Sequence, residues 1–254
     1  MTRVVKVGGR PQLDPSLCTA LARATVAAPG SLVIVHGGGD EVSTLQRLYG
    51  VEARFSGGRR VTSALDLEII RMALSGSANK RMVSALCALG IPAVGVSGED
   101  AAMLRAAPFD DALGRVGRPQ SVRIDLVRLL LGGGYLPVIA PLAAGAEGEA
   151  GALNVNGDDA AAAIAAALGA TELLFVTDVA GVRRDGETVD SLDAAGAASL
   201  LASGAAEGGM AVKVASALGA LAGGTARVRI GGTATIRDAS AGTTLTLHGE
   251  GVLT

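Results

Sequence analysis

Short runs rich in Val, Ile and Leu alternate with longer segments rich in Ala and Leu along most of this chain. The alternation predicts an α/β fold in which parallel strands are joined by crossover helices. The short runs are continuously apolar, which is typical of strands covered on both faces. The predicted strands cover residues 4–7, 32–35, 93–96, 136–139, 173–177 and 227–230, and the predicted helices cover residues 16–27, 40–48, 65–74, 79–89, 125–131, 158–168, 194–202 and 210–222.

Composition narrows the class of protein. The net charge of −2, the 2% aromatic content and the lack of a basic block argue against nucleic-acid binding. No apolar run approaches the roughly 20 residues of a membrane helix, and the N-terminus has no signal-peptide pattern. Cys18 and Cys87 are too few to predict a disulfide framework or a zinc site. We therefore expect a soluble cytoplasmic protein without a membrane or nucleic-acid partner.

A low-complexity segment near mid-chain suggests how the 254 residues are divided. Residues 143–151 (AAGAEGEAG) are typical of a flexible loop. We place the boundary between two lobes there, with an N-terminal lobe at residues 1–145 and a C-terminal lobe at residues 146–254.

Two of the predicted strands run directly into glycine-rich turns. Lys6 and Val7 are followed by Gly8 and Gly9, and the second strand is followed by HGGG at residues 36–39. Glycines at the ends of parallel strands let backbone N–H groups approach an anion, and a helix that begins there adds its positive end. One such turn is commonly only a tight connection, but two with a lysine leading into the first predict a phosphate site.

Lysine is scarce in this chain, with three lysines against nineteen arginines. A lysine is a compact point charge that can contact a single phosphate oxygen, whereas arginine is a broad planar fork. Lys6 precedes the first glycine pair, and Lys213 follows Gly-Gly-Met-Ala-Val in a predicted helix. Both settings suit phosphate binding, whereas the surroundings of Lys80 indicate a structural role at a helix start or an interface.

The phosphate-binding patterns of three common folds are absent from the sequence. The chain has no G-x-x-x-x-G-K-[ST] P-loop, and its first turn does not match the G-x-G-x-x-G dinucleotide fingerprint. The H-R-D and D-F-G motifs of protein kinases are absent as well. The predicted phosphate site therefore belongs to a different scaffold.

Several other polar residues are candidates either for ligand binding or for an ordinary structural role. Arg59 and Arg60 lie in a glycine-flanked loop and suit a carboxylate. The NVNGDD segment at 154–159 precedes a helix and suits either capping or a site. Asp178 follows a strand at the edge where α/β sheets bind ligands, and His36 is expected to be a structural hydrogen-bonding residue.

Six ordered segments make the chain resemble the acetylglutamate kinases, which belong to the amino-acid kinase fold family. The segments are residues 6–9 (KVGG), 36–39 (HGGG), 58–62 (GRRVT), 154–158 (NVNGD), 177–181 (TDVAG) and 208–214 (GGMAVKV). Residues 73–80 (ALSGSANK) and 95–100 (GVSGED) also resemble the family, so the similarity runs almost from end to end.

The resemblance implies a three-layer αβα sandwich with a mostly parallel open central sheet. It implies a homodimer in which the N-terminal lobe binds N-acetyl-L-glutamate and the C-terminal lobe binds ATP. The implied reaction is phosphorylation of the substrate γ-carboxylate in arginine (ornithine) biosynthesis. A carboxylate has an ordinary pKa of about 4.3 and is already ionised at pH 7, so the reaction needs no general base. No carboxylate cage is evident in the sequence, so Mg²⁺ is expected to be carried by the ATP phosphates.

The resemblance also implies roles for individual residues. Lys6 and Lys213 would flank the transferring phosphoryl group, glycine N–H groups would donate to it, and Asp158 would orient the two lysines. The implied catalytic residues are Lys6, Lys213, Asp158, Gly9 and Gly39; the substrate-binding residues are Gly38, Gly39, Arg60 and Asn154; the nucleotide-binding residues are Lys6, Gly8, Gly9, Asp178 and Lys213; no residue is implied as a metal ligand.

The chain departs from the family pattern at two positions. Arg59 stands where the family usually has leucine, so either Arg59 or Arg60 would hold the substrate, and the register before Val61 favours Arg60. Asp159 adds a carboxylate where the family often has an uncharged residue. Arginine-inhibited members carry an additional N-terminal helix, and the first strand here begins at about residue 3. We therefore expect an unregulated homodimer; the alternative is an arginine-sensitive enzyme, as some shorter members of the family are.

The nearest alternative is the related kinase that phosphorylates carrier-protein-bound α-aminoadipate in lysine biosynthesis. Those kinases tend to replace the third glycine of the HGGG turn and to remodel the segments around Arg60 and Asn154, whereas Gly39 and both segments have the acetylglutamate form here. A non-catalytic nucleotide-sensing module is the other alternative, and the presence of both Lys6 and Lys213 favours an enzyme.

Overall fold

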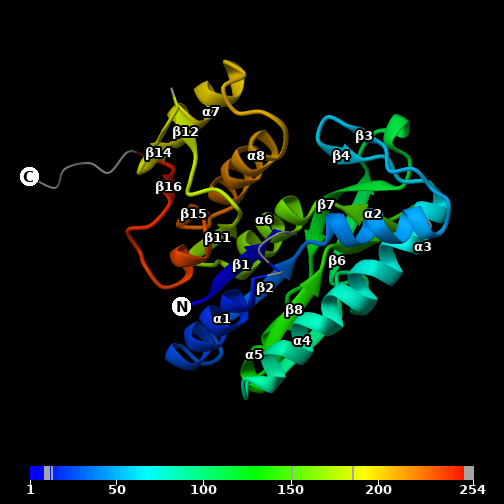
Figure 1. The fold of residues 1–254 in the computed structure, drawn as a ribbon, viewed down its shortest axis with the longest axis horizontal. Coiled ribbons are helices and arrows are strands. Elements are labelled where there is room, and N and C mark those ends of the chain that lie inside the picture. The colour runs from blue at the N-terminus through cyan, green and yellow to red at the C-terminus, as the bar shows by residue number, and fades with distance from the viewer. Residues whose placement is uncertain (9–11, 13, 150, 185, 249–254) are drawn as a thin grey trace, which may run out of the picture.

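The computed structural model describes residues 1–8, 12, 14–149, 151–184 and 186–248, and an eight-stranded sheet runs through its centre (Figure 1). The strand order is β14-β16-β15-β11-β1-β2-β8-β5, and only β15 and β16 pair antiparallel. The strands are β1 (Arg3–Val7), β2 (Leu32–His36), β5 (Ala93–Ser97), β8 (Leu136–Ala140), β11 (Glu172–Val176), β14 (Ser191–Asp193), β15 (Arg227–Gly231) and β16 (Thr243–Thr246). All six predicted strands are confirmed, and β14 and β16 extend the sheet beyond them.

The predicted helices are present as well. They are α1 (Pro15–Ala27), α2 (Gly39–Leu48), α3 (Ala64–Arg71), α4 (Asn79–Ala88), α5 (Asp125–Gly132), α6 (Gly157–Leu168), α7 (Ala194–Ala202) and α8 (Gly208–Ala222). A π-helical segment, Met72–Ala78, joins α3 to α4, and short 3₁₀ turns occupy Asp100–Ala102, Asp111–Leu113 and Thr233–Ile236. No helix among the described residues is long and apolar enough to span a bilayer.

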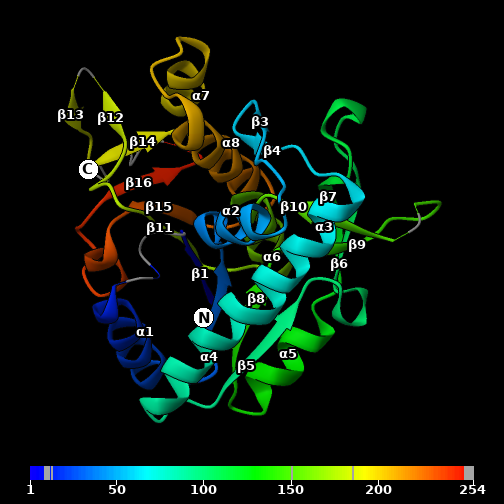
Figure 2. The same ribbon diagram turned by 45° about the vertical axis from the view of Figure 1, so that its right-hand side comes forward.

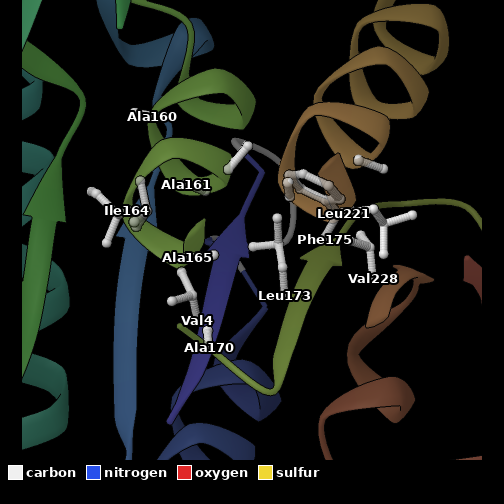
Figure 3. Close-up of a cluster of buried hydrophobic side chains, with 14 of the residues drawn as sticks. Val4, Ala160, Ala161, Ile164, Ala165, Ala170, Leu173, Phe175, Leu221 and Val228 are labelled. Carbon is white, nitrogen blue, oxygen red and sulfur yellow. The ribbon is translucent and has the colours of Figure 1, made fainter. Parts of the chain in front are cut away.

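Helices cover both faces of the sheet. Successive side chains of a strand point to opposite faces of the sheet, so each central strand contributes side chains to two separate hydrophobic clusters. Val5 and Leu174 pack in a buried cluster with α1 and α4. Val4 and Leu173 pack on the opposite face with α6 and α8, as Figure 3 shows, and α5 and α7 add to this second cluster. This arrangement confirms the predicted αβα sandwich.

A small closed barrel was not predicted from the sequence. Its strands are β6 (Leu104–Pro108), β7 (Val116–Val122), β9 (Leu142–Gly145) and β10 (Ala152–Val155). The expectation of a loop from residue 143 is wrong at its start, because Ala143 is buried in β9 and pairs with Leu153 of β10. Small residues are required where the barrel strands approach closely, since a Cβ at Gly117 would lie 2.8 Å from side-chain carbons of Ala106 and Leu153. Small residues in this part of the chain are therefore explained by close packing between strands and not only by turns.

Two short hairpins project from the sandwich. The first consists of β3 (Phe55–Ser56) and β4 (Arg59–Arg60), and the second of β12 (Arg183–Arg184) and β13 (Glu187–Thr188). The proposed lobe boundary between residues 145 and 146 falls in the connection between β9 and β10. The division into lobes 1–145 and 146–254 stays a prediction.

Candidate active site

Gly8 and Gly37, the first residues after β1 and β2, lie at the carboxyl edge of the sheet. The Gly8 amide donates to the Val176 carbonyl at 3.0 Å, and the Gly37 amide donates to the Val7 carbonyl at 2.9 Å. Because the Gly8 N–H already donates to Val176, it would not donate to a ligand. Gly8 would only allow a ligand to approach the backbone closely, since it has no side chain. Gly9 lies outside the described residues, and its role stays a prediction. Open α/β sheets bind ligands at this edge.

A buried carboxylate brings the two predicted phosphate lysines together. Lys6 Nζ lies 2.8 Å from Asp158 Oδ1, and Lys213 Nζ lies 3.4 Å from Asp158 Oδ2. The side chains of Lys6, Asp158 and Lys213 are 9%, 5% and 15% exposed. These ion pairs between largely buried side chains hold two positive charges at one end of the sheet, where a polyanion would meet them.

Local structure explains why these three residues converge. Lys6 is the fourth residue of β1, Asp158 lies in the first turn of α6, and Lys213 lies in the second turn of α8. Asn156 caps α6 and accepts a hydrogen bond from the Asp158 amide at 2.8 Å. A Cβ at Gly157 would lie 3.2 Å from Lys6 Cε, so glycine lets the lysine stem pass close to the helix start.

The pKa of Asp158 is lowered despite its burial. Burial alone would raise the pKa of this carboxyl group, but the ammonium groups of Lys6 and Lys213 outweigh that effect and hold the pKa below its ordinary value. Asp158 is therefore an anion throughout the neutral range and acts as a fixed counter-charge rather than as a proton donor.

A pocket of about 190 Å³ opens beside this cluster, between the HGGG turn and the start of α6. Its walls include Gly38, Gly39, Arg60, Asn154 and Gly157. It therefore contains every residue that was predicted to bind the substrate.

The start of α2 forms part of the wall of this pocket. Gly38 has a φ of +151°, and a Cβ there would lie 2.7 Å from Leu74 Cδ2, so only glycine fits. α2 begins at the next residue, Gly39, and the first amides of a helix have no acceptor within it. This geometry suits the predicted donation of N–H groups to an anion.

Arg60 lies against the same turn. Its Nη2 donates to the Gly39 carbonyl and to Ser43 Oγ, each at 2.9 Å, and its Nη1 donates to Gln46 Oε1. The guanidinium also lies over the Phe55 ring at 4.7 Å from its centroid. These contacts hold a half-buried positive charge at the pocket wall, as a carboxylate-binding residue requires.

Asn154 is linked to Arg60 through one hydroxyl group. Asn154 Nδ2 donates to Thr62 Oγ1 at 3.1 Å, and Thr62 Oγ1 donates to the Arg60 carbonyl at 2.9 Å. Strand β10 and the β3–β4 hairpin therefore share a side of the pocket, although their sequences are far apart.

The His36 ring lies between the HGGG turn and Asn79. Its Nδ1 lies 2.7 Å from the Gly37 carbonyl, and its Nε2 lies 3.1 Å from Asn79 Nδ2. Burial lowers the pKa of His36 to about 4, so the ring is neutral at pH 7 with both nitrogens engaged. This arrangement agrees with the predicted structural role. Asn79 was not singled out from the sequence, and the only sign of it was its place in the ALSGSANK segment.

Two residues that the sequence singled out, Arg59 and Asp178, make contacts that lie away from the lysine cluster. Arg59 also reaches the pocket wall, but its guanidinium pairs with Asp159 at 2.7 Å, which favours Arg60 as the substrate-binding arginine. Asp178 is exposed two residues beyond β11, where its Oδ1 accepts a hydrogen bond from Thr177 Oγ1 at 3.1 Å. Its role on the nucleotide side stays a prediction.

The fold and the paired-lysine site define a class of protein. The sequence model of the amino acid kinase family matches residues 1–232, so the chain belongs to this family. The fold is shared with the smu.665 protein of Streptococcus mutans UA159, with a TM-score of 0.86, 27% identity and coverage of 97% of this chain and 99% of that one. A carbamate kinase of Giardia shares the fold alone, with a TM-score of 0.74, 17% identity and coverage of 97% and 99%.

Sequence comparison narrows the class further. The acetylglutamate kinase of Roseiflexus sp. (strain RS-1) is 45% identical over 233 residues, which cover 90% of this chain and 88% of the relative. The acetylglutamate kinase of Rubrobacter xylanophilus is 45% identical and covers 91% and 89%, and that of Chloroflexus aurantiacus is 42% identical and covers 97% of both chains. Within the amino acid kinase family, the chain therefore groups with the acetylglutamate kinases.

Proposed function

We propose that this protein transfers the γ-phosphoryl group of ATP to the γ-carboxylate of N-acetyl-L-glutamate, in the biosynthesis of arginine. The observation that carries the proposal is the Lys6–Asp158–Lys213 cluster next to a pocket walled by Arg60. The cluster suits a phosphoryl group, and the arginine suits the α-carboxylate of an acyl amino acid. The acetylglutamate kinases that are 41–45% identical to most of this chain support the choice of substrate.

The site suits a reaction that needs charge neutralisation rather than proton removal. A γ-carboxylate oxygen attacks the γ-phosphorus, the bond from that phosphorus to the β–γ bridging oxygen breaks, and ADP leaves with the electron pair. The nucleophile is already ionised at neutral pH, and neutral His36 has both ring nitrogens in hydrogen bonds. The barrier is then lowered by positioning and by the positive charges of Lys6 and Lys213.

The nucleotide and its metal ion fit the same edge of the sheet. Two ammonium groups held by one carboxylate leave a net positive charge there, which suits a triphosphate. Lys6 and Lys213 would contact the phosphates, Gly8 and Gly9 are predicted to bind the nucleotide as well, and Asp178 would face the rest of it. Mg²⁺ bound with the nucleotide would supply further neutralisation of the developing charge.

Arg60→Ala is expected to raise the KM for N-acetylglutamate by about 10-fold or more while changing kcat little, because it removes binding common to the ground state and the transition state. The guanidinium is held at the pocket wall by Gly39 and Ser43, so its loss leaves the α-carboxylate without a positive partner. Steady-state kinetics at saturating ATP measure the effect. An unchanged KM would point instead to Arg59 as the substrate-binding arginine.

The proposed reaction is tested by trapping its product. The protein with ATP, Mg²⁺, N-acetylglutamate and hydroxylamine should yield the hydroxamate of the acyl phosphate. Omission of N-acetylglutamate is the control and should abolish the product. Hydroxamate formation only with carrier-bound α-aminoadipate would contradict the proposed substrate.

The assembly and location follow as further parts of the proposal. We infer a cytoplasmic homodimer in which residues 1–145 bind the acyl amino acid and form the dimer contact, while residues 146–254 bind ATP. Light scattering coupled to size-exclusion chromatography measures the mass of the assembly against the 25.0 kDa chain.

A further inference from the structure

The ion pair between Arg59 and Asp159 joins two parts of the molecule that carry different site residues. Arg59 Nη1 lies 2.7 Å from Asp159 Oδ2, and the two side chains are only 14% and 19% exposed. Arg59 lies in β4 beside Arg60, whereas Asp159 follows Asp158 in the first turn of α6. The pair therefore connects the neighbour of the proposed substrate-binding arginine to the neighbour of the carboxylate that holds both lysines.

Each partner is held in place by a second contact. The Arg59 guanidinium lies over the Phe109 ring, 4.1 Å from its centroid, in a cation–π contact. Asp159 Oδ1 accepts a hydrogen bond from Ser216 Oγ of α8 at 2.6 Å. Because both groups are oriented by these neighbours, they lose less side-chain entropy on pairing than the long side chains of an exposed ion pair do.

The tip of the β3–β4 hairpin contacts α8 beside a phosphate lysine. A Cβ placed on Gly58 would lie 3.3 Å from Val212 Cγ2 and 3.6 Å from the Gly208 carbonyl oxygen. Val212 directly precedes Lys213, and Figure 2 shows the hairpin beside α8. The hairpin that carries Arg60 is therefore packed against the helix that carries Lys213.

We propose that Arg59 and Asp159 are positioning residues that hold the β3–β4 hairpin against α6 and α8, and so place Arg60 at a set distance from the two phosphate lysines. The inference rests on the proposed function, because it assigns Arg60 to the substrate. The ion pair preorganises the pocket without touching the reacting atoms. Its loss releases the hairpin, and the substrate must then spend binding free energy on ordering it.

A double-mutant cycle with Arg59→Leu, Asp159→Asn and the double variant tests this inference. Each single variant is expected to raise the KM for N-acetylglutamate by about 5- to 20-fold, with kcat and the KM for ATP nearly unchanged, and the double variant should be no worse than the worse single one. Asp159→Glu, which keeps the carboxylate, should restore most of the affinity. The matched control is the exposed pair Arg123 and Asp125, at 3.6 Å, whose variants Arg123→Leu and Asp125→Asn should leave KM unchanged.

Hydrogen exchange of the ligand-free protein gives a readout that does not depend on the reaction. Backbone amides of residues 55–60 should exchange faster in Arg59→Leu and in Asp159→Asn than in the wild type. Absence of hydroxamate with the wild type would overturn the proposed function but leave this measurement valid. A wild-type exchange rate in both variants, or an unchanged KM in Asp159→Asn beside a raised KM in Arg59→Leu, would overturn the positioning role. If Arg59→Leu does not fold, Asp159→Asn and Asp159→Glu decide the question alone.

Discussion

Replacement of Lys213 or Lys6 by arginine is expected to lower kcat by about 10²- to 10³-fold, the loss that follows removal of one donor to a developing charge. Both ammonium groups converge on Asp158 in a largely buried space, and the Lys6 stem lies 3.2 Å from the position of a Cβ at Gly157. A broad guanidinium cannot occupy the same volume or direct its charge at one phosphate oxygen. The hydroxamate rate at saturating ATP and N-acetylglutamate measures the effect.

The third lysine provides the matched control for these variants. Lys80 is exposed near the start of α4, and its Nζ donates to the Gly95 carbonyl at 2.9 Å. Lys80→Arg should leave kcat within about twofold of the wild type, as surface substitutions usually do. Near-normal turnover in both Lys6→Arg and Lys213→Arg would contradict the role assigned to the pair.

Asp158→Asn is expected to lower kcat by about 10²-fold and to reduce the free energy of unfolding by about 3 kcal/mol. The substitution leaves the ammonium groups of Lys6 and Lys213 facing each other without the carboxylate that they share. They then repel, move apart and no longer flank the phosphoryl group. Steady-state kinetics and urea unfolding followed by circular dichroism measure the two effects. Asp111→Asn, at an exposed position of a 3₁₀ turn, is the control and should match the wild type.

The stability difference between the wild type and Asp158→Asn should depend on pH in one direction. The ammonium groups hold the folded-state pKa of Asp158 below the ordinary value of 3.8, despite the opposing effect of burial. A lowered folded-state pKa means that the stabilisation is present above pH 3.8 and is lost as the pH falls through the folded-state value. A difference that disappears well above pH 3.8 would contradict the ion-paired state of Asp158.

The secondary structure of the sandwich was predictable because it depends on short-range patterns. Apolar runs and alanine-rich segments identified six of the eight strands of the central sheet and the eight α-helices with shifted ends. The barrel strands β6, β7, β9 and β10 escaped prediction because they lack the continuous runs of Val, Ile and Leu that mark the predicted strands, and because they are stabilised by pairing with one another. Ala143 illustrates the reason, since its neighbours in sequence are typical of a loop and only its partner strand makes it part of a sheet.

Part of the site was predictable and part was not. Lys6 and Lys213 could be singled out because lysine is scarce in this chain and each of the two stands close to a glycine pair. Glycines near a lysine are a local pattern typical of phosphate binding. The support that Asn79 gives to His36 could not be foreseen, because an asparagine inside a helical segment has no distinctive local pattern. Its hydrogen bonds to the Val138 carbonyl and to His36 exist only when α4 packs on the sheet.

Local sequence patterns were enough to identify the alternation of strands with helices, the two glycine turns that follow strands, and the two lysines in settings that suit phosphate binding. Local patterns carry this information because propensity and backbone freedom act over a few residues. The folded chain was needed to establish that Asp158 bridges both lysines, that Arg60 lies against Gly39, and that Arg59 pairs instead with Asp159. These contacts join residues far apart in the chain, so their geometry is set when the helices pack on the sheet.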